Sequence, residues 1–340
     1  MNTSDILHVL QPFVLPGVDG SRGRAMDWSS LPREKTECIL CGSSSKKLLS
    51  VQNSWPVVRC RECGLVYLSE RPAEKALTDI YSKSYYEDGD VGYKGYIGTF
   101  EKYHDTFMKI FNKRHKDLLH HARGKRLLEI GCAYGFLLDY LREREWEVTG
   151  VEISPLSSAF ARNELNLNVH TGSVESPYLE EHSYDIILLL DVLEHLHRPF
   201  DVLNRIKKLL APEGILVVQC PWELYHWEEI AEALLRGMKP GTIEPDSVPA
   251  HLYFFQPRTL EAVLRKGGFR ILARQSGNYG SIRRLVNPPA ISLRNPLKGF
   301  FRFVYFRLGL QCFLYEAARL VRLGSGIIRY AVSDSENSTQ

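Results

Sequence analysis

The chain has 340 residues, of which 44% are hydrophobic and 24% are charged, and its formal net charge is +3. This length allows one α/β domain with a full core plus smaller appendages. The N-terminus carries Asp5 and lacks a basic segment, and no uncharged apolar run approaches the roughly 18 residues of a spanning helix. We therefore expect no signal peptide and no transmembrane segment. The expected protein is a cytoplasmic enzyme.

Residues 1–35 are rich in Gly, Pro, Ser and Asp and lack sustained hydrophobic periodicity, which predicts a mobile leader. The next region, residues 36–70, holds four of the seven cysteines in the spacing C-x2-C-x18-C-x2-C, with a glycine directly after each pair. Such knuckles bring four thiolates into the tetrahedron that Zn²⁺ prefers. The predicted ligands are Cys38, Cys41, Cys60 and Cys63.

Two disulfides or four ordinary buried thiols are the alternatives for these cysteines. A reducing compartment disfavours the disulfides, and the paired spacing disfavours unconnected thiols. Four thiolates leave no open position for water, so we expect a structural zinc ribbon with a core separate from that of the catalytic domain. Residues 71–109 then form a Tyr-rich connector (IYSKSYYEDGDVGYKGY) and the start of a helix expected from Thr99 to His121.

A glycine-containing loop follows the first predicted strand of the large domain. The strand, Arg126–Ile130, runs into Gly131, and Gly135 opens a predicted helix through Arg144, so backbone N–H groups and a helix N-terminus would meet a ligand. Glu152 comes 21 residues after Gly131, at the tip of the next strand, where a carboxylate suits the hydroxyls of a ribose. The pattern indicates an adenosine ligand.

This loop departs from the dinucleotide fingerprint G-x-G-x-x-G. Glycines would be needed at 131, 133 and 136, but Ala133 and Phe136 occupy the last two positions. Glu129, just before the loop, would attract a cationic amino-acid or sulfonium end and repel a phosphate. A pyrophosphate is therefore disfavoured.

Farther along, Tyr184–Asp191 (YDIILLLD) is a near-continuous apolar run, typical of a strand buried on both faces of a parallel sheet. A helical segment, a P-x-G turn and another apolar strand follow. Residues 221–251 then interrupt the alternation of strands and helices at the edge where such folds bind ligands, which predicts a lid or acceptor wall. The alternative is a helix that covers the sheet edge, with its aromatic residues in a satellite core.

The segment LLEIGCAYG resembles the first motif of class I S-adenosylmethionine-dependent methyltransferases, [VIL]-[LVI]-[DE]-[IVL]-G-x-x-x-G. The segments DVLEHL and HLYFFQPRTLEAVLRKGGF (251–269) are similar to those of small-molecule methyltransferases, including ubiquinone-biosynthesis O-methyltransferases. The resemblance covers roughly residues 110–275. It implies an α/β fold with a doubly wound, mostly parallel, seven-stranded Rossmann-like sheet over residues 110–282, between the zinc ribbon and a C-terminal helical tail.

The same resemblance implies a site for S-adenosylmethionine. Ser173 departs from the pattern, because the family usually has an aspartate there that binds the adenine amino group. The connector and the helix after it would cover the cofactor and acceptor cleft, or their aromatic residues would pack the ribbon against the catalytic domain. The expected cofactor-binding residues are Glu129, Gly131, Cys132, Ala133, Tyr134, Gly135, Phe136, Glu152, Ile153, Ser173, Val174 and Asp191.

Methyl transfer from a sulfonium is an in-line displacement, so alignment dominates, and a base is needed only if the acceptor holds its proton. His195, His251 and Asp191 are the candidate catalytic residues. The alternative is structural, because D-x-x-E-H also suits a helix N-cap with a hydrogen-bonded pair. In that interpretation Glu194 lies in the first turn of a helix, and we expect His197 at the surface.

The composition of residues 283–340 predicts a basic, aromatic, helical tail. Between Arg283 and Tyr330 there are nine Lys/Arg residues and one acid, Glu316. Peripheral membrane contact, a nucleic-acid patch and a helical hairpin packed on the domain with its arginines outward all remain open.

The leading hypothesis is an S-adenosylmethionine-dependent methyltransferase that acts on a small molecule, on an oxygen of a sugar, a quinone-like ring or a lipid-linked metabolite. An RNA methyltransferase is an alternative, but DVLEH lacks the [DN]-P-P-[FY] motif of exocyclic-amine modifiers. A non-catalytic zinc-ribbon interaction protein is a third, and the intact glycines and acids of the loop argue against it.

Overall fold

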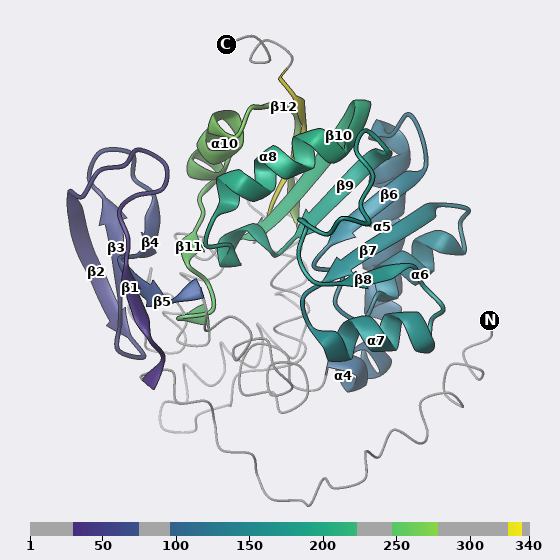
Figure 1. Ribbon diagram of the computed structural model, residues 1–340, viewed down its shortest axis with the longest axis horizontal. Helices are drawn as coiled ribbons and strands as arrows, with labels where there is room; N and C mark the ends of the chain where they lie inside the picture. The colour runs from purple at the N-terminus through teal and green to yellow at the C-terminus, as the bar shows by residue number, and fades with distance from the viewer. Residues whose placement is uncertain (1–29, 75–95, 223–246, 278–325, 335–340) are drawn as a thin grey trace, which may run out of the picture.

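The computed structural model describes residues 30–74, 96–222, 247–277 and 326–334 (Figure 1). They form a large sheet covered by helices and, beside it, a smaller sheet built mainly from the N-terminal region. Most of the predicted leader, most of the connector, most of the insertion and residues 278–325 lie outside the described residues. Residues 33–35 form a strand, so the expected end of the leader at residue 35 is wrong. Within the described part of the chain, no helix is long and apolar enough to cross a membrane.

Seven strands make up the large sheet. They are β6 (Arg126–Ile130), β7 (Glu147–Glu152), β8 (Val169–Thr171), β9 (Tyr184–Leu190), β10 (Leu210–Pro221), β12 (Phe269–Gly277) and β13 (Gly326–Ser333). Their spatial order is β12-β13-β10-β9-β6-β7-β8. All pairs from β10 to β8 are parallel, which confirms the predicted fold class and brings the carboxyl ends of these strands to one edge.

The strand β13 comes from the region expected to be a helical tail. It lies between β10 and β12 and is antiparallel to both. The expected end of the methyltransferase domain at residue 282 is therefore wrong, and the described part of the predicted helical tail is a strand. Its residues Gly326 to Ala331 are all buried, so Arg329 does not belong to a basic surface.

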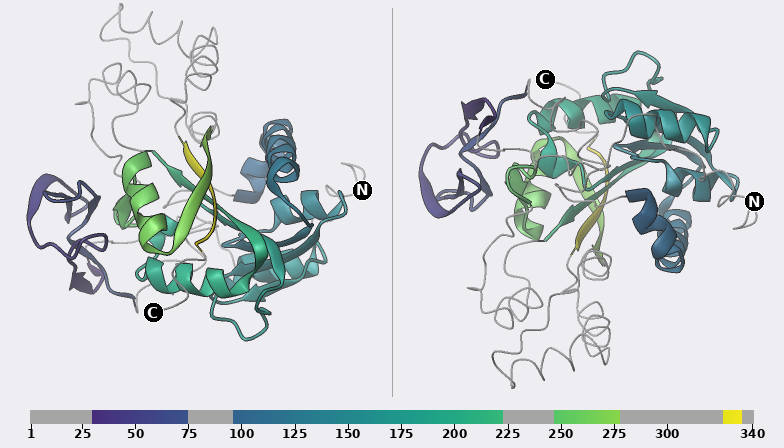
Figure 2. Two further views of the ribbon diagram at one scale, coloured as in Figure 1. Left: turned by 90° about the horizontal axis from the view of Figure 1, so that it is seen from above. Right: turned by 90° about the horizontal axis from the view of Figure 1, so that it is seen from below.

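Helices cover both faces of the large sheet (Figure 2). They are α4 (Tyr96–Lys102), α5 (His104–His121), α6 (Phe136–Arg142), α7 (Pro155–Asn163), α8 (Pro199–Leu209) and α10 (Pro257–Lys266). In β9, Ile186 and Leu188 pack in one apolar cluster with α5 and α6, whereas Ile187 and Leu189 pack in another with α8 and α10. Burial on both faces explains the continuous apolar run of this strand.

The helix expected from Thr99 to His121 forms as two helices, α4 and α5, divided at Tyr103. Phe100 of α4 stacks on Phe136, the first residue of α6, with ring centroids 3.8 Å apart and an interplanar angle of 7°. α4 therefore packs directly against the residue that follows the glycine-containing loop.

The smaller sheet combines the cysteine ribbon with a strand of the large domain. The ribbon strands are β1 (Arg33–Lys35), β2 (Lys46–Gln52), β3 (Trp55–Cys60), β4 (Val66–Leu68) and β5 (Glu70–Pro72), and the added strand is β11 (Tyr253–Phe254). The order is β11-β4-β3-β2, with β1 and β5 paired separately. β11 is antiparallel to β4, so the sheet continues from the ribbon into the large domain.

One hydrophobic cluster extends through the ribbon and one face of the large sheet. It contains Trp55 and Tyr67 of the ribbon together with Leu216 of β10 and Val263 of α10, all fully buried. The expectation of two separate cores is therefore wrong. A ribbon of this size has little apolar surface to bury by itself, and the large domain supplies the rest.

The buried Arg329 of β13 is neutralised by Glu261 of α10. The Glu261 carboxylate accepts hydrogen bonds from Arg329 Nε at 2.8 Å and from Arg274 Nε at 2.8 Å, and it also pairs with Arg265 at 3.0 Å. The hydrogen bond from Arg274, followed by the charge of Arg329, outweighs burial and lowers the pKa of Glu261 to about 2. This carboxylate joins the seventh strand to the helix that covers it.

We expect Glu261→Gln to lower the free energy of unfolding by about 3 kcal/mol, because Arg329 would remain buried without its counter-charge. The folded-state pKa is depressed, so the loss is fully present above pH 4.5 and shrinks as the pH falls toward 2. Denaturant titrations at several pH values measure it. Glu181→Gln, at a pair whose carboxylate is 52% exposed, is the control and should cost less than about 1 kcal/mol. Equal costs for the two variants would contradict the structural role of Glu261.

Candidate functional site

The loop after β6 has the backbone that a ligand-facing turn requires. Gly131, Ala133 and Gly135 all have positive φ, of 75°, 48° and 79°. A Cβ on Gly131 would lie 2.5 Å from Val192 Cγ2, and one on Gly135 would lie 2.7 Å from Leu167 Cδ1. Both glycines are therefore needed for conformation and for close packing. Gly135 is also the N-cap of α6, so the loop delivers the N-terminus of that helix to the carboxyl edge of the sheet.

Glu152, the last residue of β7, holds this loop in place. Its Oε2 accepts the Ala133 N–H at 2.9 Å, and its Oε1 accepts the Ser154 N–H at 2.8 Å. The residue is 2% exposed. Each carboxylate oxygen has a second lone pair, so the same group that orders the loop can accept hydrogen bonds from ribose hydroxyls.

Glu129 lies buried in β6 just before the loop. Burial, opposed by the charge of Arg114 and reinforced by that of Glu152, raises the pKa of Glu129 to about 8. Its Oε2 is buried and has no hydrogen-bond partner among the described residues. A cationic group in the site would supply what this oxygen lacks, which is the fit expected for the amino-acid and sulfonium end of S-adenosylmethionine.

A buried polar chain that sequence reasoning missed connects α5 to the end of β9. Arg114 of α5 donates through Nη2 to Gln219 Oε1, and Gln219 Nε2 donates to Asp191 Oδ2 at 2.9 Å. Arg114 is 8% exposed. Asp191 has a positive φ of 54°, and its N–H bonds to the Gln219 carbonyl, so both its backbone and its side chain are fixed. The sequence signal that could have predicted this buried chain is the single arginine in the middle of the amphipathic helix α5.

The other predicted cofactor residues divide into two kinds. Cys132, Tyr134 and Phe136 have buried side chains, so the loop offers a ligand their backbone only. Ile153 is 42% exposed beside Glu152, which leaves an apolar surface for a flat base. After β8, Ser173 is exposed and its Oγ accepts the Glu175 N–H at 3.3 Å, while the side chain of Val174 is buried.

Glu194, His195 and His251 come together next to this region. Each offers an atom that lies within 4.8 Å of those of the other two, so they could hold a divalent metal ion or act as a proton-transfer group. The imidazole rings of His195 and His251 are 4.7 Å apart at 82°. His195 Nδ1 lies 2.8 Å from the Ala250 carbonyl oxygen, which only accepts, so Nδ1 carries the proton and Nε2 is the basic nitrogen.

The DVLEH segment does not cap a helix. Leu193–His195 is a single 3-10 turn, and α8 begins only at Pro199. Glu194 is 1% exposed, and burial followed by the charge of Asp191 raises its pKa to about 8. His197 is 6% exposed, and its Nε2–H donates to the Pro72 carbonyl at 2.7 Å. Glu194 thus lies in the first turn of a 3-10 helix, whereas the expectation of a surface His197 is wrong.

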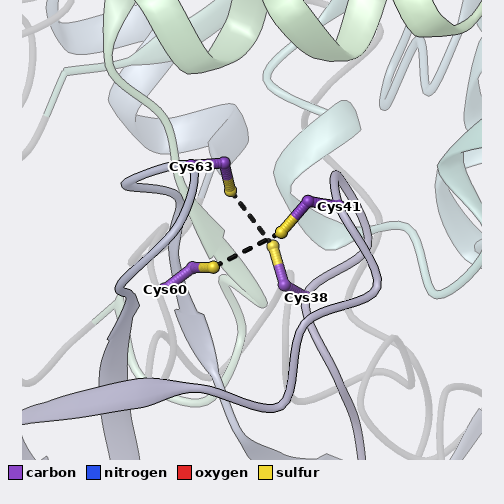
Figure 3. A group of neighbouring side chains, drawn as sticks. All are labelled: Cys38, Cys41, Cys60 and Cys63. Atoms are coloured by element: carbon purple, nitrogen blue, oxygen red, sulfur yellow. Dashed lines mark hydrogen bonds between the residues drawn. The ribbon is translucent and has the colours of Figure 1, made fainter.

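The four predicted metal ligands converge in the ribbon (Figure 3). Their sulfur atoms all lie within 4.8 Å of one another, with Cys38 and Cys63 at 3.3 Å and Cys41 and Cys60 at 3.5 Å. A disulfide requires about 2.05 Å. A tetrahedral site with Zn–S bonds of about 2.3 Å has edges of about 3.8 Å, which is close to these separations.

The turn after each cysteine pair depends on a glycine. Gly42 and Gly64 have φ of 72° and 79°, and their N–H groups bond to the carbonyls of Cys38 and Cys60. The N–H groups of Cys63 and Glu62 outweigh burial and lower the pKa of Cys60 to about 7. A thiolate is thus favoured at Cys60, whereas burial raises the pKa of Cys38 and of Cys63, and a metal ion would stabilise these thiols as thiolates.

A family model described as a methyltransferase domain matches residues 101–274. The ubiquinone biosynthesis O-methyltransferase of Hydrogenovibrio crunogenus is 25% identical over 155 residues, which cover 42% of this chain and 61% of that protein. The mitochondrial ubiquinone biosynthesis O-methyltransferase of Schizosaccharomyces pombe is 32% identical over 104 residues, or 28% of this chain and 37% of that protein. The chain thus spans about three fifths, or less, of the length of these curated relatives.

Solved structures are similar at lower identity. A SAM-dependent methyltransferase from Archaeoglobus fulgidus is 18% identical with a TM-score of 0.44, covering 70% of this chain and 99% of that one. An S-adenosylmethionine-dependent methyltransferase from Mesorhizobium loti is 16% identical with a TM-score of 0.39, covering 62% of this chain and 92% of that one.

We expect Glu152→Ala to weaken the binding of S-adenosylmethionine and of its demethylated product by about 1.5–3 kcal/mol, the loss of a charged hydrogen-bond acceptor. Unfolding of the loop adds to this loss, because the Ala133 and Ser154 N–H groups lose their acceptor. Calorimetry with the demethylated product measures the affinity. Glu147→Ala, at the exposed first residue of the same strand, is the matched control. Equal affinity for both variants would remove Glu152 from the site.

Proposed function

Because this chain belongs to the methyltransferase domain family, we propose that it transfers the methyl group of S-adenosylmethionine to a hydroxyl oxygen of a small-molecule acceptor. The names of the relatives, ubiquinone biosynthesis O-methyltransferases, support oxygen as the accepting atom and a quinone-like ring as the acceptor class. A sugar or a lipid-linked metabolite is the remaining acceptor class within the proposal.

One contact carries the proposal. Gly131 of the cofactor loop approaches Val192 so closely that a Cβ on the glycine would lie 2.5 Å from Val192 Cγ2. Val192 lies between Asp191 and the turn that bears Glu194 and His195, so the loop and the acid–histidine cluster are direct neighbours. This contact supports a donor site and an acceptor site that face each other, as an in-line displacement requires.

The chain's own groups can bind and orient a cation at this place. Glu152 is a buried carboxylate held by backbone N–H groups, and the carboxyl of Glu129, whose pKa burial raises to about 8, would ionise beside a cation, which favours the sulfonium form of the cofactor over its neutral thioether product. When bound, S-adenosylmethionine supplies an electrophilic methyl carbon. The backbone of the loop and the exposed Ile153 would fix the nucleoside, and Asp191 would lie between the cofactor and the acceptor.

We assign the proton of the acceptor hydroxyl to Nε2 of His195. Nδ1 of this ring is held by the Ala250 carbonyl, so the ring can accept at one nitrogen only. In the transfer, the acceptor oxygen bonds to carbon, the carbon–sulfur pair stays on sulfur, and the hydroxyl proton moves to the imidazole. The buried carboxyl of Glu194, whose pKa burial raises to about 8, would ionise more readily beside the imidazolium that forms and stabilise it.

The assay uses radiolabelled S-adenosylmethionine with catechol, simple sugars and a metabolite extract as acceptors. We expect transfer to a hydroxyl compound, and a fall in kcat of about 10²–10⁴ for His195→Asn, the loss typical of a missing general base. His120→Asn, at an exposed position of α5, should leave kcat unchanged.

Three other outcomes would contradict this assignment. Transfer to bulk RNA alone would make the acceptor a nucleic acid. Activity that is lost in a chelator and restored by Mg²⁺ would assign Glu194, His195 and His251 to a metal ion instead of a base. Absence of transfer to every acceptor, with binding of the cofactor intact, would favour a non-catalytic protein.

For the ribbon, we propose one structural Zn²⁺ bound by the four cysteines, because their spacing in the sequence and the separations of their sulfur atoms suit closed four-thiolate coordination. We expect metal analysis to give one zinc per chain, and a thiol-reactive mercurial to release it. Cys60→Ser should lose the metal and lower the stability of the whole described domain, because the ribbon shares its core. Cys220→Ala, a buried thiol outside the cluster, should retain the zinc. Purified protein without zinc would overturn the proposal.

A further inference from the structure

The two histidine-bearing segments are both attached to the ribbon. The main chain of Leu252 links them to each other and to β4, because its N–H donates to the Glu194 carbonyl at 2.8 Å and its carbonyl accepts the Leu68 N–H at 3.0 Å. Asn53 of the ribbon also donates to the Val248 carbonyl at 2.7 Å. The sheet hydrogen bonds of the ribbon therefore run up to the residue that follows His251.

Arg71 of β5 contacts both segments with one guanidinium group. Its Nη1 donates to the Tyr253 hydroxyl at 2.8 Å and to the His197 carbonyl at 3.3 Å, and its Nε pairs with Glu34 at 2.7 Å. The arginine side chain is 11% exposed, and Tyr253 is 1% exposed. Buried hydrogen bonds to a charged donor are costly to lose, so these contacts constrain their partners strongly.

The two partners of Arg71 lie at the same distance in sequence from the two histidines. His197 comes two residues after His195, and Tyr253 comes two residues after His251. The adjacent Pro72 accepts the His197 Nε2–H at 2.7 Å, which ties the first segment to the ribbon a second time. Glu152 on the cofactor side is instead held by the N–H groups of Ala133 and Ser154, which belong to the large domain. The ribbon thus contacts the acceptor side of the site, whereas loops of the parallel sheet hold Glu152 on the cofactor side.

We propose that Arg71 is a positioning residue for the His195–His251 pair and that the ribbon is the structural support of the acceptor side of the site. This inference rests on the proposed function for the role of the two histidines. The fixed distance between the rings then depends on a residue that lies outside the region matched by the family model, residues 101–274.

The test uses the full-length zinc-loaded protein and four variants. Arg71→Met removes all the donors, Arg71→Lys keeps a charged donor, and Tyr253→Phe removes one of the two contacts without changing shape. Arg33→Met is the matched control, because Arg33 lies in the paired strand β1 and its contacts in the described chain are with the ribbon. They are the Ser54 carbonyl at 2.9 Å, Glu70 at 3.5 Å and the Trp55 ring at 4.0 Å. Amide hydrogen exchange is followed in residues 192–198 and 248–255, together with the affinity for the demethylated cofactor product.

We expect Arg71→Met to increase exchange in both segments by about tenfold or more, and Tyr253→Phe to do so in residues 248–255 alone. Arg71→Lys should restore most of the protection, and Arg33→Met should leave both segments unchanged. Product affinity should stay within about threefold, since the cofactor side is held separately. With the acceptor found by the transfer assay, kcat should fall for Arg71→Met more than KM rises.

Unchanged exchange in residues 192–198 and 248–255 for Arg71→Met would overturn the proposal, as would equal effects of Arg33→Met. If Arg71→Met does not fold, Tyr253→Phe decides, because the isosteric ring keeps the packing. Failure of the wild-type protein to bind the cofactor product would instead count against the proposed function, and the exchange measurement does not depend on it.

Discussion

The burial of acidic groups at one edge of the large sheet is the constraint on which the site depends. Glu129, Glu152 and Glu194 are each at most 6% exposed, and Asp191 lies close enough to Glu194 for its charge to raise the pKa of that carboxyl. Like charges this close in a low-dielectric setting repel one another. The chain offsets the repulsion with one buried arginine, Arg114, and with backbone N–H groups aimed at Glu152.

Burying these acidic groups costs folding stability, and it makes the site attractive to a positively charged ligand. The pKa values of Glu129 and Glu194 rise from 4.5 to about 8, so the folded protein binds more protons than the unfolded chain between these values. The stability cost of these two groups therefore grows as the pH rises from 4.5 to 8. A bound cation would stabilise the ionised carboxylates and so reduce that cost. The site therefore binds a positively charged ligand more tightly than a neutral one.

The parts of the site that the sequence predicted are those with local causes. The predicted strand Arg126–Ile130 matches β6 residue for residue, and the positive φ values of Gly131 and Gly135 follow from the turn that joins a strand to a helix. The cysteine cluster was likewise predicted from spacing, because a metal site imposes short-range geometry.

The parts that were missed depend on contacts between distant segments. Arg114 and Gln219 are 105 residues apart, and no local pattern connects them. The sequence of β13 resembles part of a basic tail, but the strand pairs with β10 in the sheet. The charge of its Arg329 is neutralised by a residue 68 positions earlier, which no local pattern reveals. His197 looked like a surface residue since its partner, Pro72, lies 125 positions away in the ribbon.

The two sides of the site are supported by different kinds of structure, and this follows from their chemistry. The cofactor side must present several groups to one fixed ligand, and parallel strands with buried faces provide that rigidity. The proposed acceptor side consists of a 3-10 turn and a segment that ends in a two-residue strand, and these are too short to hold two imidazoles in place alone. Pairing of β11 with β4 and the buried Arg71 supply the missing hydrogen bonds. The ribbon in turn needs the core of the large domain, so each unit supports the other where the acceptor would bind.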